Sequence, residues 1–547
     1  MIAGITISLF FLLAVVLSGI VAKLLPLPVP LPLVQIGLGA VIALSTGSAI
    51  TLEPDIFFLL FLPPLLFLDG WRIPKEGLFR DYATVLEMAI GLVVFTVVGI
   101  GLFVHWLVPS IPLAAAFALA AILSPTDAVS VSAIASRVTI PKRLMRILEG
   151  ESLLNDASGL VCMQFAVAAV LTGAFSASDA VITFFRLAFG GVAIGVILTF
   201  AIGRLKDQVS RRLGEETGSQ ILISILIPFG AYLAAEHLEC SGILAAVAAG
   251  ICMSYEERRG SVLAVTRVRR AAVWDTIQFT MNGIIFVLLG EQLPGIVAGA
   301  ATVVYETGHR DPIWLVLHVI VISGSLAFLR LTWVWVSLRF TLFRAARRGK
   351  VVPTPSWKLV VATSLAGVRG AITLAGVLTL PLVMHNGLAF PARDLIIFLA
   401  AGVIIVSLLT ASLGLPFLLK DIELPPEPSH RREEDNARVL SSQAAIRAIE
   451  AAQHRMGEGK NDADLYADVA TRVMDAYRSR IDNQSSSTDP LMARNAEDID
   501  KILRLVGARA EREEIFKLAR QRQLPEESAR RLVRDIDLVE ARLTASA

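Results

Sequence analysis

Charged side chains are scarce in this sequence, and their scarcity argues against a soluble protein. Only 18% of the 547 residues are charged, where about 25% is usual for a soluble domain, and the mean hydropathy is +0.66. Cysteine is rarer still, since Cys162, Cys240 and Cys252 are the only three and lack C-x-x-C spacing. The sequence therefore predicts neither a disulfide framework nor a zinc site.

Several functional signatures are also missing. No basic stripe with interleaved aromatic residues occurs, and the net charge is only +2, so we expect no nucleic-acid partner. The sequence contains neither the G-x-x-x-x-G-K-[ST] motif of nucleotide-binding loops nor the G-x-S-x-G motif of hydrolases. We expect no enzymatic activity.

The few charges that are present divide the chain into two parts. Residues 421–547 contain 21 of the 50 Lys and Arg and 25 of the 48 Asp and Glu, which leaves 29 and 23 for residues 1–420. We predict a hydrophobic body over residues 1–420 and a polar helical regulatory tail over residues 421–547. Apolar spacing in the tail predicts amphipathic helices at 436–480 and 497–545, joined by a linker at 485–490.

Long apolar runs fill the body. A bilayer core about 30 Å thick is crossed by a helix of about 20 apolar residues. Thirteen such runs can be counted, of which the ninth is short and the second and third are interrupted by glycine or proline. They predict an all-α polytopic membrane protein with about 13 transmembrane helices, near residues 5–22, 31–46, 55–69, 83–107, 112–136, 147–173, 181–203, 219–236, 240–253, 272–293, 313–343, 357–380 and 395–419.

Basic residues in the loops predict the orientation. Loops that follow odd-numbered segments contain 22 Lys and Arg, whereas loops that follow even-numbered segments contain only Arg310 and Arg393. Cytoplasmic loops of membrane proteins are enriched in Lys and Arg. This alternation predicts an N-terminus outside the cell membrane and a cytoplasmic C-terminal tail.

Oxygen-bearing side chains gather on one face of the segment at 147–173. Glu151 and Asn155 are four residues apart, as are Ser152 and Asp156, so all four share one broad helical face. An ionisable side chain at membrane depth costs at least about 2–3 kcal/mol and suggests function. Hard cations prefer oxygen ligands, so this face predicts an ion-binding site at Asp156, Ser152 and Asn155.

Two other segments are interrupted at charged residues. Pro125 breaks the segment at 112–136 just before Thr126 and Asp127, and two glycines flank Arg369 in the segment at 357–380. Unwound backbone survives at membrane depth only where it lines a cavity or is buried in protein. Asp127 could serve the site or only cap the break. Arg369 must find an acid or the negative C-terminal ends of half-helices, and it could serve stability alone.

The two breaks occur in corresponding positions of the chain. Segments four to six and eleven to thirteen form matching halves, inverted because seven helices separate them. Paired broken helices in two repeats point to a transporter site near the bilayer midplane. We therefore expect inverted repeats with two broken, crossing helices. Asp69 ends the third segment, where it could belong to an ion funnel or cap the helix at the interface.

These residues resemble a known family. The stretches LPPLLFLDGW, SPTDAVSVSAI, EGESLLNDASGLV and GVRGAITLA are similar to the Na⁺/H⁺ exchanger branch of the monovalent cation/proton antiporter superfamily. The resemblance spans about residues 5–420. It implies a homodimer in the membrane lipid, with six core helices at about 83–173 and 313–419 and a dimerisation scaffold in the remainder of the body.

The resemblance also implies roles for individual residues. Asp156 would bind the cation or the proton, and Ser152 and Thr126 would supply further Na⁺ ligands. Asp127 would balance half-helix dipoles, and Glu151 would pair with Arg369. Asn155 stands where electrogenic relatives carry a second aspartate, which implies exchange of one Na⁺ for one H⁺.

The expected function is therefore antiport that serves pH homeostasis, with Na⁺ and H⁺ as substrates and no cofactor. An ionised Asp156 can bind Na⁺ and a protonated one cannot, so the two ions compete. K⁺ and Li⁺ remain alternatives to Na⁺ because all three prefer oxygen ligands. A cation channel and a proton-coupled transporter of an organic solute are the rival classes, which single-channel currents or solute-dependent proton flux would reveal.

Overall fold

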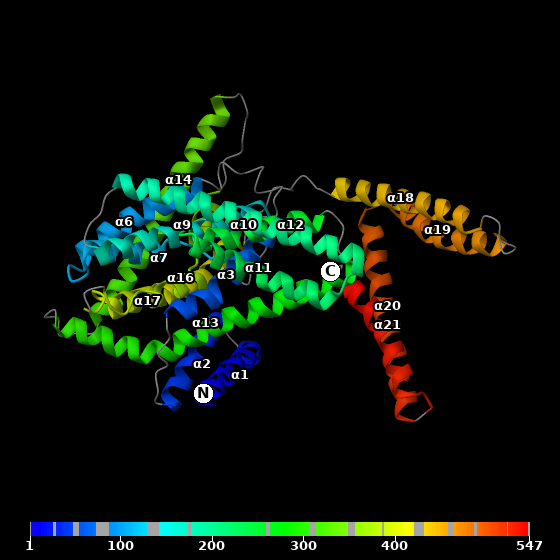
Figure 1. The fold of residues 1–547 in the computed structure, drawn as a ribbon, viewed down its shortest axis with the longest axis horizontal. Coiled ribbons are helices and arrows are strands. Elements are labelled where there is room, and N and C mark those ends of the chain that lie inside the picture. Colours follow the sequence, from blue (N-terminus) through cyan, green and yellow to red (C-terminus); the bar gives the residue numbers. More distant parts are fainter. Residues whose placement is uncertain are drawn as a thin grey trace. The chain divides into compact units, whose positions relative to one another are not determined.

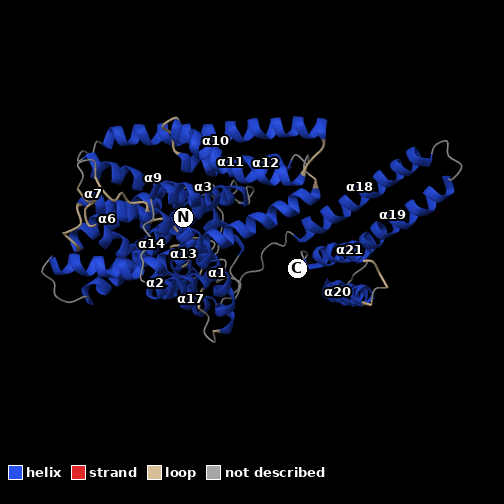
Figure 2. Ribbon diagram, turned by 60° about the horizontal axis from the view of Figure 1, so that its bottom comes forward, coloured by secondary structure: helices blue, strands red, loops and turns tan. Residues whose placement is uncertain are grey.

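The computed structural model contains two compact units, residues 1–423 and 424–547. It describes residues 2–25, 29–46, 54–72, 87–127, 131, 142–172, 177–258, 263–306, 313–347, 356–384, 388–420, 431–457, 463–485, 490–521 and 523–544. Over these residues the chain is helical, and the one pairing of extended backbone is an isolated bridge between Val383 and Ala389 (Figure 2).

A helix lies in each of the thirteen predicted segments (Figure 1). Residues 83–86, 128–130, 132–136 and 173 of these segments lie outside the described residues. The helices of the body are α1 (Ile2–Leu24), α2 (Leu31–Thr46), α3 (Pro54–Arg72), the π-helical turn η1 (Glu87–Gly91) with α6 (Leu92–Leu107), α7 (Leu113–Leu123), α9 (Lys142–Thr172), α10 (Ala177–Leu213), α11 (Thr217–His237), α12 (Gly242–Arg258), α13 (Ala264–Glu306), α14 (Ile313–Arg347), α15 (Trp357–Leu365), α16 (Ala371–Leu378) and α17 (Arg393–Leu419).

Apolar composition and length single out six of these helices as able to cross a membrane, and four shorter ones are also apolar. The six lie in α9, α10, α11, α13, α14 and α17. The glycines of the second segment and the prolines of the third do not break their helices, since α2 is continuous and α3 runs through Pro63 and Pro64. The apolar helices make the chain a multi-pass membrane protein.

Glycines let two pairs of helices approach closely. A Cβ at Gly39 of α2 would overlap the carbonyl of Val287 in α13, and one at Gly290 of α13 would overlap the carbonyl of Ile36. Gly70 of α3 and Gly250 of α12 form the same reciprocal arrangement. Small residues are favoured where membrane helices pack backbone to backbone, so these contacts fix the places of α3 and α13.

The tail forms two helical pairs within the two stretches where the sequence predicted amphipathic helices. Helix α18 (Arg431–Gly457) packs on α19 (Ala463–Ser485), and α20 (Pro490–Arg520) packs on α21 (Glu526–Thr544). A small core joins the second pair, made by Ala508, Ile515, Ala529 and Ile536. Most of the predicted linker, residues 486–489, and the junction at 421–430 lie outside the described residues.

Candidate cation-binding site

The two interrupted segments meet in the interior of the body. Helix α7 ends at Leu123 and is followed by the non-helical residues 124–127, and α15 and α16 are separated by residues 366–370. The Asp127 backbone N–H donates to the carbonyl of Val368 at 2.7 Å, so the two breaks touch. A side chain at Gly370 would overlap the Asp127 carboxylate. This carboxylate therefore lies at the N-terminal end of α16, where a negative charge is favoured.

Arg369 satisfies carbonyl groups that the breaks leave without helical partners. Its Nε donates to the Leu123 carbonyl at 3.0 Å, and its Nη1 donates to the Gly367 carbonyl at 2.5 Å. These carbonyls belong to the C-terminal ends of α7 and α15, which carry partial negative charge. Of the two partners that the sequence left open for Arg369, the half-helix ends are the ones observed.

The predicted pair between Glu151 and Arg369 is wrong, because Arg330 of α14 occupies Glu151. Arg330 donates from Nη1 to Oε1 of Glu151 at 2.5 Å and from Nη2 to Oε2 at 2.9 Å. The side chains of Arg330 and Glu151 are 3% and 0% exposed. A bidentate guanidinium–carboxylate pair is the geometry that best offsets the cost of burying two charges.

A chain of hydrogen bonds connects this ion pair to Thr126. The Thr126 hydroxyl donates to Oε1 of Glu151 at 3.3 Å and accepts from Nδ2 of Asn155 at 2.9 Å. A hydroxyl has one proton and two lone pairs, so the group that remains on Thr126 is an acceptor. The Oδ1 of Asn155 is buried and has no hydrogen-bond partner among the described residues. Both features suit a cation more than an anion.

A small cavity, partly open to solvent, lies beside the two breaks. Five of the predicted site residues line it, namely Asp69, Thr126, Asp127, Ser152 and Asp156. Asp156 is 3% exposed. The face of α9 is thus divided, because Ser152 and Asp156 face the cavity while Glu151 and Asn155 bond to Arg330 and Thr126 behind it.

Sequence reasoning missed three polar side chains of the cavity wall, Gln278 and Asn282 of α13 and Thr373 of α16. Gln278 and Asn282 are four residues apart in a predicted membrane segment, and this spacing was the available signal. An uncharged amide costs less free energy to bury than an ionised acid, so its presence in a membrane segment is a weaker indication of function.

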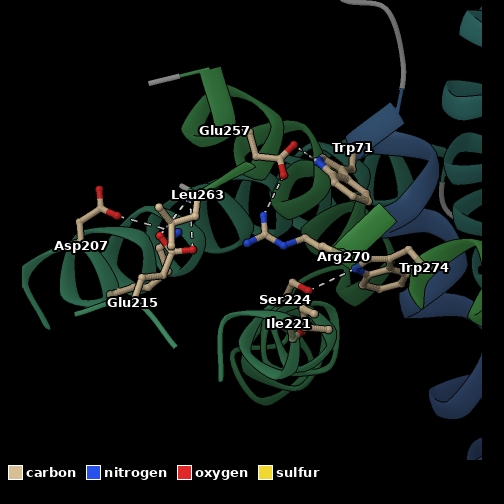
Figure 3. A network of polar contacts seen from close by, with 10 residues as sticks. Trp71, Asp207, Glu215, Ile221, Ser224, Glu257, Leu263, Arg270 and Trp274 are labelled. Carbon is tan, nitrogen blue, oxygen red and sulfur yellow. Dashed lines mark hydrogen bonds and ion pairs between the residues drawn. The ribbon is translucent and has the colours of Figure 1, made fainter. Parts of the chain in front are cut away.

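Two helices, α12 and α13, hold the end of α3 that carries Asp69. Trp71 donates from Nε1 to Oε2 of Glu257 in α12 at 2.9 Å, and Oε1 of Glu257 accepts from Arg270 of α13 at 2.8 Å (Figure 3). The ring of Trp71 lies 6.4 Å from that of Trp274. These contacts hold the end of α3, and Asp69 lines the cavity wall.

Comparison with known proteins shows the family of the chain. The profile described as "Sodium/hydrogen exchanger, transmembrane" matches residues 11–421, about three quarters of the chain. The chain belongs to the sodium/hydrogen exchanger family. The resemblance inferred from the sequence motifs is confirmed.

Members of this family from other bacteria are similar to the chain over almost its whole length. An uncharacterised Na⁺/H⁺ exchanger of Escherichia coli is 40% identical over 539 residues, which cover 97% of each protein. A sodium, potassium, lithium and rubidium/H⁺ antiporter of Bacillus pumilus is 39% identical over 501 residues, which cover 91% of this chain and 72% of the relative.

The fold is also similar to a solved exchanger structure. The sodium proton antiporter MjNhaP1 of Methanocaldococcus jannaschii aligns with a TM-score of 0.56 and 20% identity, over 76% of this chain and 99% of that structure. This likeness supports the all-helical fold of a membrane antiporter.

Proposed function

We propose that this exchanger-family protein moves a monovalent cation across the membrane in exchange for H⁺ at Asp156. The observation that carries the proposal is the cavity, in which the buried Asp156 lies with Ser152, Thr126 and two further carboxylates. Among the residues that the structure describes, no Lys or Arg lines its wall. The similarity to a sodium, potassium, lithium and rubidium/H⁺ antiporter of Bacillus pumilus supports it. Na⁺ is the expected cation, with Li⁺ and K⁺ as alternatives.

Competition for one carboxylate couples the two ions. An ionised Asp156 binds the cation with oxygens from Ser152 and Thr126, and protonation of the same carboxylate expels it. The Thr126 hydroxyl suits this role because Glu151 and Asn155 leave it only an acceptor toward the cavity. Asp69 belongs to the ion funnel, where its negative charge attracts cations toward Asp156.

Exchange of one cation for one proton follows from the charges around Asp156. Glu151 is neutralised by Arg330, and Asn155 is uncharged. Asp127 lies at the N-terminal end of α16, whose dipole favours a permanent negative charge there. One carboxylate then alternates between a proton and a cation, and the cycle is electroneutral.

Transport uses elevator-type alternating access. The helices at about 83–173 and 313–419 move as a core past a scaffold formed by the rest of the body, which also forms a homodimer. The fold comprises about 13 membrane crossings in inverted repeats, and its two broken helices cross beside the cavity. The N-terminus is outside the cell membrane, the tail regulates transport from the cytoplasm, and the activity serves pH homeostasis.

The test is Asp156→Asn in everted membrane vesicles. We expect cation-dependent proton movement, followed as dequenching of a pH-sensitive dye, to fall to the background of vesicles without the protein. The amide keeps the volume of the carboxylate but cannot exchange a proton near neutral pH. Asp207→Asn, outside the cavity, is the matched control and should exchange normally. Undiminished exchange in correctly inserted Asp156→Asn protein would refute the assignment.

A further inference from the structure

The two amides of α13 that line the cavity, Gln278 and Asn282, come from a helix outside the predicted core. Their spacing of four residues places both on one face of α13. An amide in a membrane segment is costly unless its polar atoms find partners. The partners of the two amide oxygens therefore decide what each side chain can bind.

The two amide oxygens differ in their partners. Oε1 of Gln278 accepts a hydrogen bond from Nη1 of Arg72 at 2.7 Å, and the same guanidinium pairs with Asp275. Asn282, half-buried, makes no hydrogen bond within the described part of the chain. Arg72 thus occupies the oxygen of Gln278, whereas the oxygen of Asn282 remains available to the cavity.

We propose that Asn282 supplies a neutral oxygen to the transported cation and sets the selectivity among alkali cations. The inference rests on the exchange proposed above and deepens it. A cation that enters the cavity must replace part of its hydration shell with oxygens from the protein. Smaller cations hold that shell more tightly, so the number and strength of the oxygen ligands decide which cation is favoured.

The carboxylates of the cavity attract every alkali cation by charge, and they attract the smaller cations more strongly because these approach the oxygens more closely. A neutral oxygen held on the wall of a packed helix adds a ligand at a set place. The close packing of α13 against α2 through Gly39 and Gly290 holds this wall. Loss of the oxygen should therefore affect Li⁺, Na⁺ and K⁺ unequally.

The experiment measures the apparent KM for Li⁺, Na⁺ and K⁺ in everted vesicles that contain Asn282→Leu, which is similar in size and lacks the oxygen. We expect KM for the favoured cation to rise by roughly fivefold to tenfold, the effect of one lost ligand. We also expect the ratio of KM for K⁺ to KM for Na⁺ to change by about threefold or more. Asn282→Asp, which keeps an oxygen and adds charge, should favour the smaller cations.

Two variants serve as comparisons. Gln292→Leu removes an amide of α13 that does not line the cavity and should leave all three KM values at those of the unaltered protein. Gln278→Leu removes the amide whose oxygen Arg72 already occupies, so its KM ratios should change by less than about twofold.

An unchanged KM ratio in Asn282→Leu, or a rise by one common factor for all three cations, would overturn the proposal. If Asn282→Leu fails to insert, Asn282→Asp decides, and KM ratios equal to those of the unaltered protein would then reject it. Failure of the exchange itself is distinct, because the unaltered protein would then show no cation-dependent proton movement.

Discussion

Two arginine–carboxylate pairs flank the cavity, and their surroundings differ greatly. Arg330 and Glu151 are 3% and 0% exposed, with two hydrogen bonds between them. The side chains of Arg72, at the end of α3, and of Asp275 in α13 are 39% and 65% exposed. Water solvates the second pair and screens its attraction, whereas the first pair has only the protein around it. The same chemical contact therefore serves the fold in one place and can rearrange in the other.

Loss of Arg330 should have the largest effect on stability. Arg330→Ala leaves the charge of Glu151 buried without its partner, which should destabilise the protein by about 3–5 kcal/mol. The measurement is thermal unfolding in detergent, with Asp156→Asn as a control for substitutions in the same region.

A second substitution tests whether the stranded charge is the cause. Arg330→Ala combined with Glu151→Gln should regain a substantial part of the lost stability, because the buried charge is removed with its partner. If the double variant is as unstable as Arg330→Ala plus the separate effect of Glu151→Gln, the two side chains do not interact.

Loss of Arg369 should have an intermediate effect. Arg369→Ala removes the donors to the carbonyls of Leu123 and Gly367, and unpaired buried carbonyls should cost roughly 2–3 kcal/mol. Because Glu151 pairs with Arg330, Arg369→Ala and Glu151→Gln should have nearly additive effects on thermal stability. A strong coupling between these two substitutions would restore the pair predicted from the sequence.

Loss of Arg72 should have the smallest effect on stability. Arg72→Gln removes an exposed ion pair, which is worth at most about 1 kcal/mol, and the change should shrink further at high salt because exposed charges are screened. Asp275→Asn is the matched variant from the other side of the pair. A loss of stability comparable to that of Arg330→Ala would show that exposure does not separate the two pairs.

Much of the fold could be predicted because hydropathy reports directly on membrane helices. Each apolar run contains a helix, and Pro125 and the glycines around Arg369 correctly marked the two breaks. In the tail, the predicted amphipathic stretches proved to be helical pairs. An apolar stripe continues on both sides of a turn, so periodicity alone did not reveal where each helix reverses.

The partners of the charged residues were harder to predict. Arg330 and Arg369 both lie in apolar segments, and the sequence gives no distance that would choose between them for Glu151. The division of α9 into a cavity side and a bonded side depends on where α14 and α7 pack. Asn282 is uncharged, so the sequence did not mark it as a candidate ligand. It also lies more than 100 residues from Asp156 in the chain, so only the packing of α13 brings it to the cavity.

The cavity wall contains side chains from both the predicted core and the predicted scaffold. Asp156 and Thr126 belong to the core, in α9 and in the break after α7. Asp69 and Asn282 belong to the scaffold, in α3 and α13. A cation held by the core and the scaffold together would act as a temporary link between two parts that slide past each other in the proposed mechanism. Each additional ligand from α3 or α13 would then strengthen binding and slow translocation. Affinity and turnover would be opposed quantities in this protein, and a weakly held cation would be carried fastest.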